Sequence, residues 1–351
     1  MIIIDGSFLL RNLTGIERYA FEVTKRLDTL VEDDQIQIYV PKNAKHIPKL
    51  EHIQVVVSDK ECESFPKFEH FTFSHYARTQ HAIPLNFNNL TPFFYPGIAY
   101  LHDIYPLVHP EDFTSRRDKL VAKYDVLMAR HVARKARHII TVSNHSKEEI
   151  VKILKVNPER VSVIPNGWDH FTQIGTDETI FQKFPQLQKK NYFFTLGSLS
   201  KRKNLKWIAK YAQEHQDQQF VISGKAISGL VPDELKALQT LKNVILAGYL
   251  SDREVKALMQ HCKAFVFPSY YEGFGIPPLE ALSTGAPIIV SNASCLPEIY
   301  QDSAHYIDPD DTNINLDELL KQPVADPTPI LDTYTYQKAA ESLAALLGKF
   351  T

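Results

Sequence analysis

Hydrophobic residues follow two alternating patterns along the chain. Short apolar runs bounded by polar residues, clearest at 2–4, 139–142 and 264–267, predict buried strands. Between such runs apolar residues recur at helical spacing. In a helix predicted over 16–30, one face is formed by Ile16, Tyr19, Ala20, Val23 and Leu27. Strands that are apolar throughout and alternate with helices are typical of parallel sheets covered on both faces. The pattern therefore predicts an α/β fold.

The length of the chain indicates two domains. A chain of 351 residues is longer than one ordinary hydrophobic core supports. A polar stretch with little periodicity, 169–190, separates two series of strands and helices and is the predicted linker. We therefore expect one Rossmann-like domain over 1–168 and a second over 191–351. Residues 60–95 show little periodicity, so we expect irregular structure there, with one strand at 71–73, and assign them no chemistry.

Composition narrows the class of protein. The net charge of −2 and the pI near 6.7 argue against a nucleic-acid-binding protein, which usually has a basic excess. The three cysteines are scattered, odd in number and without metal-ligand spacing, which favours a reducing compartment. A strand is predicted from the second residue, so we expect no signal peptide. No apolar run approaches the roughly 20 residues of a membrane span. We expect a cytoplasmic protein.

One loop combines glycines, prolines and two glutamates eight positions apart. The apolar run 264–267 predicts a strand, and Leu279 begins the apolar spacing of a helix with Pro277 or Pro278 at its first position. The free N–H groups and positive dipole end of such a helix favour an anion, typically phosphate. Glu280, expected in the first turn, has two interpretations: it accepts hydrogen bonds from vicinal hydroxyls such as those of a ribose, or it merely supports the helix start.

The stretch EGFGIPPLEALSTGAPIIVSN, followed by LPEI, resembles the E-x7-E signature of retaining glycosyltransferase family 4. This resemblance implies the GT-B fold, in which two Rossmann-like, doubly wound domains face a central cleft. It implies catalytic roles for Glu272 and, in the first domain, His102. Further roles are implied for four residues of the loop: donor-sugar contacts for Gly273 and Phe274 beside Glu272, a phosphate contact for Gly275, and nucleoside binding for Glu280.

The resemblance extends to loops of the first domain. Gly15, after the first predicted strand, matches a glycine that approaches the donor diphosphate through backbone N–H groups. Thr14 and Glu17 have the spacing of a capping box for the helix that follows. His102 and Asp103 match a loop that faces sugar and acceptor. A lone histidine is more often structural, but this one follows a predicted strand at the sheet edge where open α/β sheets bind ligands. Asp103 is a weaker acceptor candidate.

Three basic residues, 201–203, crowd the start of a predicted helix in the second domain. Cations are unfavourable at that dipole end, so a negative group is expected to compensate. A diphosphate fits, with Arg202 donating to two oxygens and Lys203 acting as a point charge; a solvated basic turn is the alternative. Many family members have arginine where this chain has Ser198, which leaves open which basic residue meets which oxygen. Tyr249 and Leu250 match residues that hold the nucleotide base through backbone groups.

We expect neither a metal nor another cofactor. The pair Asp308-x-Asp310 has the spacing of a metal-binding motif, but it lies in a proline turn that we place far from the other site loops. Arg202, Lys203 and two helix ends would instead neutralise the leaving group. No G-x-G-x-x-G follows the first strand, which argues against a dinucleotide-dependent dehydrogenase.

A basic helix is predicted over 115–137. Its apolar stripe, expected to pack on the sheet, comprises Leu120, Val121, Tyr124, Leu127, Met128 and Val132. Eight basic residues against two acidic ones exceed what packing explains. We hypothesise that this face contacts anionic lipid headgroups at the inner face of the cell membrane, near a lipid-linked acceptor.

The residues and the resemblance together predict a metal-independent glycosyltransferase, and the resemblance implies retention at the anomeric carbon. It would move a sugar from a GDP-, UDP- or dTDP-linked donor to a glycan or lipid-linked saccharide in surface polysaccharide synthesis, and the two domains would close over the donor. Nothing in the sequence selects the sugar or nucleotide, although the loops at 14–19 and 102–106 resemble those of mannosyl- and rhamnosyltransferases. Two alternatives remain: a nucleotide-sugar epimerase of the same fold, and a non-catalytic sugar-nucleotide-binding subunit.

Overall fold

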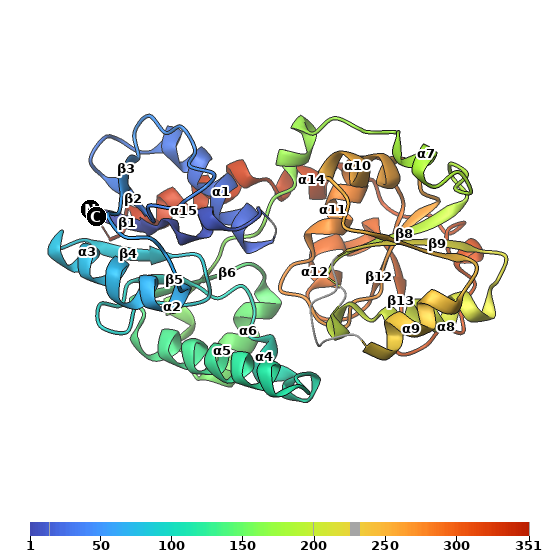
Figure 1. Ribbon diagram of the computed structural model, residues 1–351, viewed down its shortest axis with the longest axis horizontal. Helices are drawn as coiled ribbons and strands as arrows, with labels where there is room; N and C mark the ends of the chain where they lie inside the picture. The colour runs from blue at the N-terminus through green and yellow to red at the C-terminus, as the bar shows by residue number, and fades with distance from the viewer. Residues whose placement is uncertain (14, 199, 225–231, 351) are drawn as a thin grey trace. The chain divides into compact units, whose positions relative to one another are not determined.

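The computed structural model describes residues 1–13, 15–198, 200–224 and 232–350, and it divides into two compact units. Unit 1 comprises Met1–Pro110, Leu120–Gly167 and Tyr334–Thr351. Unit 2 comprises Glu111–Lys119 and Trp168–Thr333. Each unit is built on one parallel sheet with helices on its faces, as the ribbon in Figure 1 shows. The predicted α/β class is confirmed.

Unit 1 contains a seven-stranded sheet in the order β3-β2-β1-β4-β5-β6-β7, and every pairing is parallel. Its strands are β1 (Ile2–Asp5), β2 (Ile36–Val40), β3 (Gln54–Val57), β4 (Ile83–Asn86), β5 (Ile98–Tyr100), β6 (His138–Thr141) and β7 (Val161–Val163). The chain builds outward from β1 in one direction and then returns to β4 to build in the other. The carboxyl ends of β1 and β4 therefore mark a topological switch point, where open sheets leave room for a ligand.

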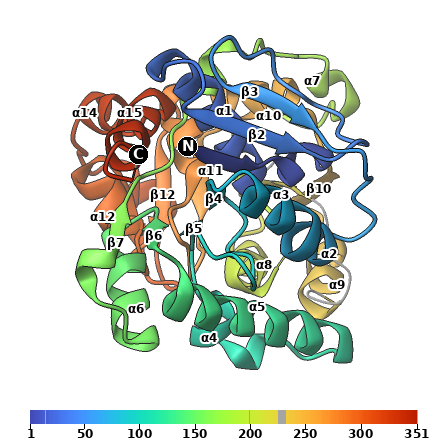
Figure 2. The same ribbon diagram turned by 90° about the vertical axis from the view of Figure 1, so that its left-hand side faces the viewer.

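Helices flank this sheet in chain order. They are η1 (Gly6–Leu10), α1 (Ile16–Leu27), η2 (Asp28–Leu30), α2 (Phe65–Lys67), η3 (Phe68–Phe73), α3 (Ser74–Thr79), α4 (Tyr105–Val108), η4 (Pro110–Asp112), α5 (Arg116–Lys135), α6 (Asn144–Leu154) and η5 (Pro158–Arg160). Most of η4 and the first turn of α5 are grouped with unit 2. Figure 2 shows unit 1 from the side on which the two chain ends lie. The described N-cap of α1 is Gly15, with a positive φ of 52°. Thr14 lies outside the described residues, and Glu17 forms an ion pair with Arg11 at 3.1 Å.

The last helix, α15 (Tyr336–Leu347), belongs to unit 1. Our predicted second domain extended to residue 351, and this end of its boundary is corrected. Tyr336, Ala340 and Leu343 are buried in one cluster with Tyr19 and Val23 of α1. The apolar face of α15 is therefore covered by α1, and the two helices run beside each other in Figure 1.

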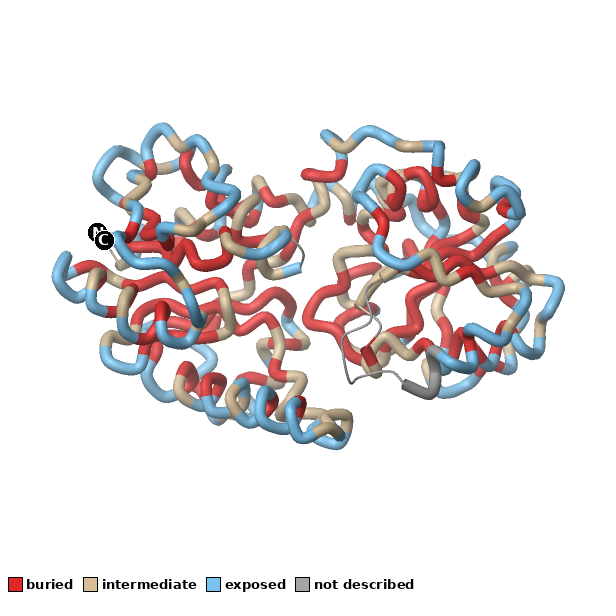
Figure 3. Tube along the Cα trace, in the orientation of Figure 1, coloured by how far each residue is buried: buried red, intermediate tan, exposed pale blue. Residues whose placement is uncertain are grey.

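Unit 2 contains a six-stranded parallel sheet in the order β10-β9-β8-β11-β12-β13. Its strands are β8 (Tyr192–Leu196), β9 (Gln219–Ser223), β10 (Val244–Gly248), β11 (Ala264–Phe267), β12 (Ile288–Ser291) and β13 (His305–Ile307). The switch point of this sheet lies between β8 and β11. The central strands of both sheets are buried along their length (Figure 3), because helices cover both faces.

The helical elements of unit 2 are mostly short. They are η6 (Asp169–Gln173), α7 (Ile180–Lys183), η7 (Lys201–Lys203), α8 (Leu205–Glu214), α9 (Pro232–Thr240), α10 (Asp252–His261), α11 (Ile276–Ser283), α12 (Leu296–Tyr300), η8 (Gln301–Ser303), α13 (Leu316–Leu319) and α14 (Thr328–Thr333). Over the described residues of both units, no helix combines the length and the hydropathy that a membrane crossing requires.

Two sequence-based expectations are wrong at the level of single elements. Residues 71–73 are the end of η3, a π-helix, rather than a strand. The stripe assigned to α5 is only partly buried: Met128 and Val132 are covered, but Leu120 and Leu127 are 70% and 53% exposed. Alanines form much of the packed face instead, at positions 122, 129, 133 and 136. Ala129, Ala133 and Ala136 share a buried cluster with Ala99 of β5 and Ile139 of β6, whereas Leu120 and Leu127 lie outside that cluster and are exposed.

Candidate active site

The carboxyl ends of β8, β9 and β11 surround a small cavity of about 10 Å³, enough for one water molecule. It lies at the switch point of the unit 2 sheet, the usual place for a ligand in an open α/β sheet. The lining residues come from three strand ends and from the start of α8: Thr195, Leu196, Gly197, Ser198, Lys203, Leu205, Ile222, Ser223 and Phe267. The predicted basic residue Lys203 is therefore directed to this edge.

Lys203 and Glu272, predicted from separate loops, form an ion pair in this place. The Nζ atom of Lys203 lies 2.5 Å from Oε1 of Glu272, and the two side chains are only 12% and 6% exposed. The ammonium also lies 4.7 Å from the centroid of the Phe267 ring. Charges this deeply buried need a partner, and each supplies one for the other. A Cβ atom at Gly197 would lie 3.3 Å from Lys203 Cε, so glycine there leaves room for the lysine chain.

The loop between β11 and α11 is shaped by Gly275. Its φ of 87° lies in the left-handed region, and a Cβ atom would lie 2.8 Å from Leu296 Cδ2, so only glycine fits without a shift. Gly275 is the N-cap of α11, which begins at Ile276. Pro277 therefore occupies the second helical position rather than the first. Gly273 and Phe274 are both buried, which leaves backbone groups as the means by which Phe274 would meet a sugar.

Glu280 lies in the second turn of α11, not the first as expected, because the helix starts at residue 276. Its Oε1 atom lies 3.3 Å from Nε2 of His170, a residue of η6 that is 6% exposed. The sequence pattern places residue 170 in the linker and gives it no role. No spacing signals this contact, since 110 positions separate the two residues and only the fold of unit 2 joins them.

Arg202 and the loop after β11 are joined through the backbone: the Tyr270 N–H donates to the Arg202 carbonyl at 3.0 Å. Asn204, in the left-handed region with φ 55°, donates from Nδ2 to the carbonyls of Pro268 and Pro309 at 3.1 and 2.7 Å. These contacts fasten three loops of unit 2 to one another around the start of α8.

The turn that contains Asp308 and Asp310 was expected to lie far from the site loops, and this is wrong. Nε1 of Trp207, in the first turn of α8, donates to the Asp308 carbonyl at 3.1 Å. Because β13 ends at the same sheet edge, its turn reaches the start of α8. Oδ1 of Asp308 accepts from the N–H of Asp310, as in an ordinary Asx turn. Within the described part of the chain, no three His, Cys, Asp or Glu side chains are grouped so as to hold a metal ion.

Tyr249 and Leu250 follow β10 at the same edge of the sheet. Tyr249 is 65% exposed, whereas Leu250 is buried. The preceding Gly248 has φ 69°, and its carbonyl accepts from the Ser223 hydroxyl at 3.0 Å. Ser251 then caps α10 with Glu254 in a capping box. Gly224 follows β9 at this edge, and residues 225–231 lie outside the described part of the chain.

In unit 1, His102 follows β5 and is 7% exposed. Its Nε2 atom lies 3.0 Å from the Phe87 carbonyl, which can only accept, so this nitrogen donates. Burial lowers the pKa of the imidazole to about 4, and the ring is therefore neutral at pH 7. Nδ1 is then the acceptor of the ring. Asp103 accepts from the N–H of Tyr105 at 3.1 Å and so supports the start of α4.

A buried polar cluster at the switch point of unit 1 was missed. Asp5 and Asn86 end β1 and β4, and their side chains hydrogen-bond at 2.9 Å. Glu69, on η3, accepts from the Ser7 hydroxyl at 3.2 Å and from Asn88 at 3.1 Å. Burial raises the pKa of both carboxyls, and for Glu69 the nearby Asp5 raises it further. Nothing in the apolar pattern of residues 60–95 indicates that Glu69 points inward.

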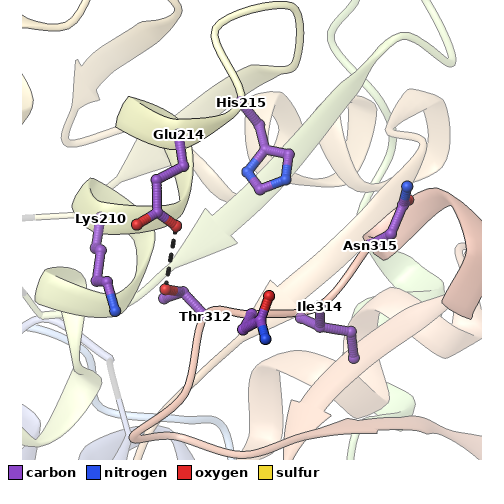
Figure 4. A pocket seen from close by; sticks show the side chains of 7 residues that line it. Lys210, Glu214, His215, Thr312, Ile314 and Asn315 are labelled. Atoms are coloured by element: carbon purple, nitrogen blue, oxygen red, sulfur yellow. Dashed lines mark hydrogen bonds between the residues drawn. The ribbon is translucent and has the colours of Figure 1, made fainter.

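A second hollow of about 500 Å³ lies on unit 2 beside the end of α8, and Figure 4 shows its polar lining. The Thr312 hydroxyl donates to Glu214 at 3.3 Å there. None of the residues predicted for the site lines this hollow, so its size gives no reason to prefer it.

Comparisons with known proteins agree with the two-part organisation. The family model for glycosyl transferases group 1 matches residues 176–339, and the model for glycosyltransferase family 4 matches residues 13–170. The O-antigen chain mannosyltransferase RfbU of Salmonella typhimurium is 29% identical over 237 residues, covering 66% of this chain and 60% of the relative. The O-antigen chain mannosyltransferase B of Escherichia coli is 26% identical over 341 residues, covering 86% and 84%.

Among solved structures, the sucrose-phosphate synthase of Thermosynechococcus elongatus is similar with a TM-score of 0.68. The match covers 99% of this chain and 97% of that one at 14% sequence identity. At that identity the likeness concerns the fold alone, and together with the two parallel sheets it confirms the predicted GT-B class.

Proposed function

The chain belongs to the glycosyltransferases of family 4 and group 1, and on this premise we propose that it transfers a sugar from a nucleotide-sugar donor to a saccharide acceptor in surface polysaccharide synthesis. The observation that carries the proposal is the buried pair of Lys203 and Glu272 at the switch point of the unit 2 sheet. The Lys203 ammonium, which would bind phosphate, lies next to the Glu272 carboxylate, which would accept hydrogen bonds from sugar hydroxyls. The mannosyltransferases to which the chain is similar support a polysaccharide product.

The donor would bind on unit 2. Lys203 and Arg202 would neutralise the diphosphate, aided by the N–H groups at the start of α11 beyond Gly275. Positive groups already in place when the leaving group becomes charged lower the barrier electrostatically, and in this proposal they do so without a metal. Glu272, with backbone groups of Gly273 and Phe274, would orient the sugar. We further propose retention at the anomeric carbon, with the acceptor attacking on the face that the diphosphate leaves.

The nucleoside would be held by Glu280 and by backbone groups of Tyr249 and Leu250. The His170 contact favours this role for Glu280, because an imidazole N–H that holds one carboxylate oxygen leaves the other to accept from ribose hydroxyls. On unit 1, Gly15 remains a proposed diphosphate contact, and His102 through Nδ1 and Asp103 remain proposed sugar or acceptor contacts. A Cβ atom at Gly15 would meet nothing within 4 Å, so its backbone is open to approach.

We also propose that α5 rests on an anionic membrane at its cytoplasmic face, which suits a lipid-linked acceptor. Leu120 and Leu127 are two helical turns apart, point outward, and have Lys123 and Arg130 exposed beside them. Apolar side chains flanked by cations are typical of helices that lie in the interface of a bilayer. We call the surface formed by these four residues the α5 outward face.

Aromatic residues extend the α5 outward face. Phe71 and Phe94 are 59% and 68% exposed, with ring centroids 5.7 Å apart. Phe93 is joined to α5 by its ring contact with His131 at 4.5 Å. An exposed cluster of aromatics next to a basic helix is what a membrane interface would bury.

The proposed transfer is tested by a thermal-shift screen against UDP-, GDP- and dTDP-sugars, followed by assay of the stabilising donors with saccharide acceptors. We expect one nucleotide to raise the unfolding temperature, and its nucleoside diphosphate to be released only when acceptor is present. Conversion of the donor sugar without release would instead identify an epimerase. Donor binding with neither reaction would identify a non-catalytic subunit.

A further inference from the structure

The loop that contains Glu272 is fastened from one side by the segment that follows β12. Three side-chain hydroxyls in residues 291–300 donate to backbone carbonyls of this loop. The accepting carbonyls belong to every third residue of the loop. The pairs are Ser291 to Ser269, Ser294 to Glu272 and Tyr300 to Gly275. Such regular fastening fixes the path of a loop that has no backbone ladder of its own.

Ser294 makes the central contact twice. Its Oγ atom accepts from the N–H of Glu272 at 3.1 Å and donates to the carbonyl of the same residue at 2.7 Å. The thiol of Cys295 adds a contact to this carbonyl at 3.2 Å. Glu272 is 5% exposed, so water has little access to these groups and the Ser294 hydroxyl satisfies both.

The backbone of Ser294 is strained in a way that its contacts explain. Its φ is 56°, in the left-handed region that residues other than glycine, asparagine and aspartate rarely adopt. Glycine would occupy this conformation without strain but has no hydroxyl. Strain of this kind persists where the surrounding structure requires it, often at functional sites. We therefore infer that serine occupies this strained position because of its hydroxyl.

We propose that Ser294 is a positioning residue for sugar transfer, which it serves by fixing the backbone of Glu272 and hence the direction of its carboxylate. The inference rests on the proposed function, in which Glu272 contacts the donor sugar. With the backbone of Glu272 held at both polar groups, its Cα–Cβ bond keeps one direction, and the carboxylate at the end of the side chain lies 2.5 Å from Nζ of Lys203. A shift of about 1 Å at a reacting group costs up to roughly 100-fold in rate. The proposed diphosphate cations Arg202 and Lys203 lie on η7, and Gly275, the proposed phosphate contact within the Glu272 loop, is held by Tyr300 rather than by this hydroxyl.

The test compares Ser294→Gly with Gln301→Gly. Both replace a residue of positive φ in unit 2 by glycine, at φ 56° and 46°. Gln301 is exposed, and within the described part of the chain no side-chain hydrogen bond or ion pair joins it to the Glu272 loop. For Ser294→Gly we expect an unchanged or higher unfolding temperature, a kcat lower by about 10- to 100-fold, and a calorimetric affinity for the free nucleoside diphosphate within about twofold of the unmodified chain. For Gln301→Gly we expect an unchanged kcat.

Two further measurements separate positioning from general support. Ser294→Ala keeps the strained backbone and loses the hydroxyl, so its kcat should fall like that of Ser294→Gly while its unfolding temperature also drops. Amide hydrogen exchange at Glu272 should accelerate in both variants and not in Gln301→Gly, because the N–H loses its acceptor.

Equal kcat for Ser294→Gly and Gln301→Gly would overturn the inference. It would also be overturned if nucleoside-diphosphate affinity fell in proportion to kcat, since Ser294 would then support the whole loop, or if exchange at Glu272 stayed unchanged. A lack of transfer by the unmodified chain with every donor would instead refute the proposed function on which the inference rests.

Discussion

The ammonium of Lys203 and the carboxylate of Glu272 neutralise each other where neither meets much water. A buried pair of this kind is costly to break from one side, because the remaining charge is left without a partner. The donor must therefore compete with Glu272 for the lysine, and the lysine must compete with the sugar for Glu272. Substituting Glu272 is therefore expected to change nucleoside-diphosphate binding and turnover in opposite directions.

Lys203→Ala should weaken binding of the nucleoside diphosphate by roughly 10- to 100-fold, as expected for the loss of one charge-assisted hydrogen bond. Isothermal calorimetry with the nucleotide selected by the screen measures this. Lys206→Ala is the control, since it removes an exposed charge from the same helix start. Equal affinities for the two variants would reject the phosphate role of Lys203.

Glu272→Gln should lower kcat by at least about 100-fold, the scale of a lost electrostatic contact in the transition state. The same change should tighten nucleoside-diphosphate binding, because Lys203 no longer has a charged partner. Steady-state kinetics and calorimetry on one preparation measure both effects. Near-normal turnover would show that the site lies elsewhere, and weaker diphosphate binding would contradict the competition between carboxylate and phosphate.

At the scale of elements, α5 differs most from expectation. Its alanine-rich face packs on the sheet. Leu120 and Leu127, which the apolar pattern predicted to pack there, are exposed instead. The helix Arg116–Lys135 contains seven basic and two acidic residues. Contact of this outward face with an anionic membrane would explain both the exposed leucines and the excess of basic residues.

Replacing Leu127 and Phe94 by glutamate should abolish flotation with vesicles of phosphatidylcholine and phosphatidylglycerol, and leave the unfolding temperature nearly unchanged because both side chains are exposed. Ile153→Glu is the control, at an exposed apolar residue on α6. We expect the unmodified chain to float with these vesicles and not with pure phosphatidylcholine. Equal flotation with charged and uncharged vesicles would refute the proposed contact with an anionic membrane. Binding to another protein instead of vesicles would show that this face has a protein partner.

At the scale of the whole molecule, the carboxyls of Asp5 and Glu69 link folding to pH. Their folded pKa values are raised by burial above the usual carboxyl range of roughly 4. As pH rises above that range, the unfolded chain releases these protons while the folded chain retains them. The contribution of these two carboxyls to stability is therefore present at low pH and is lost as pH rises through the raised pKa values, the opposite of the usual carboxylate trend.

Glu69→Gln should flatten this dependence. The unfolding temperature of the unmodified chain, measured from about pH 5 to pH 9, should decline more steeply than that of the variant. Glu63→Gln, at an exposed position of the same segment, is the control and should leave the slope unchanged. A slope that Glu69→Gln does not alter would show that the Glu69 carboxyl is ionised in the folded chain.

Much of the fold was predictable because it depends on local periodicity. The strands around residues 2–4 and 264–267 and the helix over 16–27 are signalled by apolar spacing within a single element. The misses depend on what each element contacts. Residues 71–73, at the end of η3, were predicted as a strand because the buried residues of this π-helix include Glu69 and His70 and form no apolar stripe at helical spacing. The membership of α15 in unit 1 depends on α1, a helix more than 300 residues earlier.

The residues of the candidate site show the same difference between what local sequence signals and what distant contacts decide. Glu272 and Lys203 were predicted because motif and charge mark them in the sequence. His170, Ser294 and Glu69 were not, because each acts through a neighbour distant in the chain.

The sequence by itself determined the parallel α/β class, the division into two domains and the family, since apolar period, length and motif are properties of order along the chain. Only the tertiary structure decided that Lys203 pairs with Glu272, that Ser294 fastens the backbone of Glu272, and that α5 turns its leucines outward. The physical reason is that hydrogen bonds, ion pairs and burial act over a few ångströms in space, and separation along the chain does not state that distance.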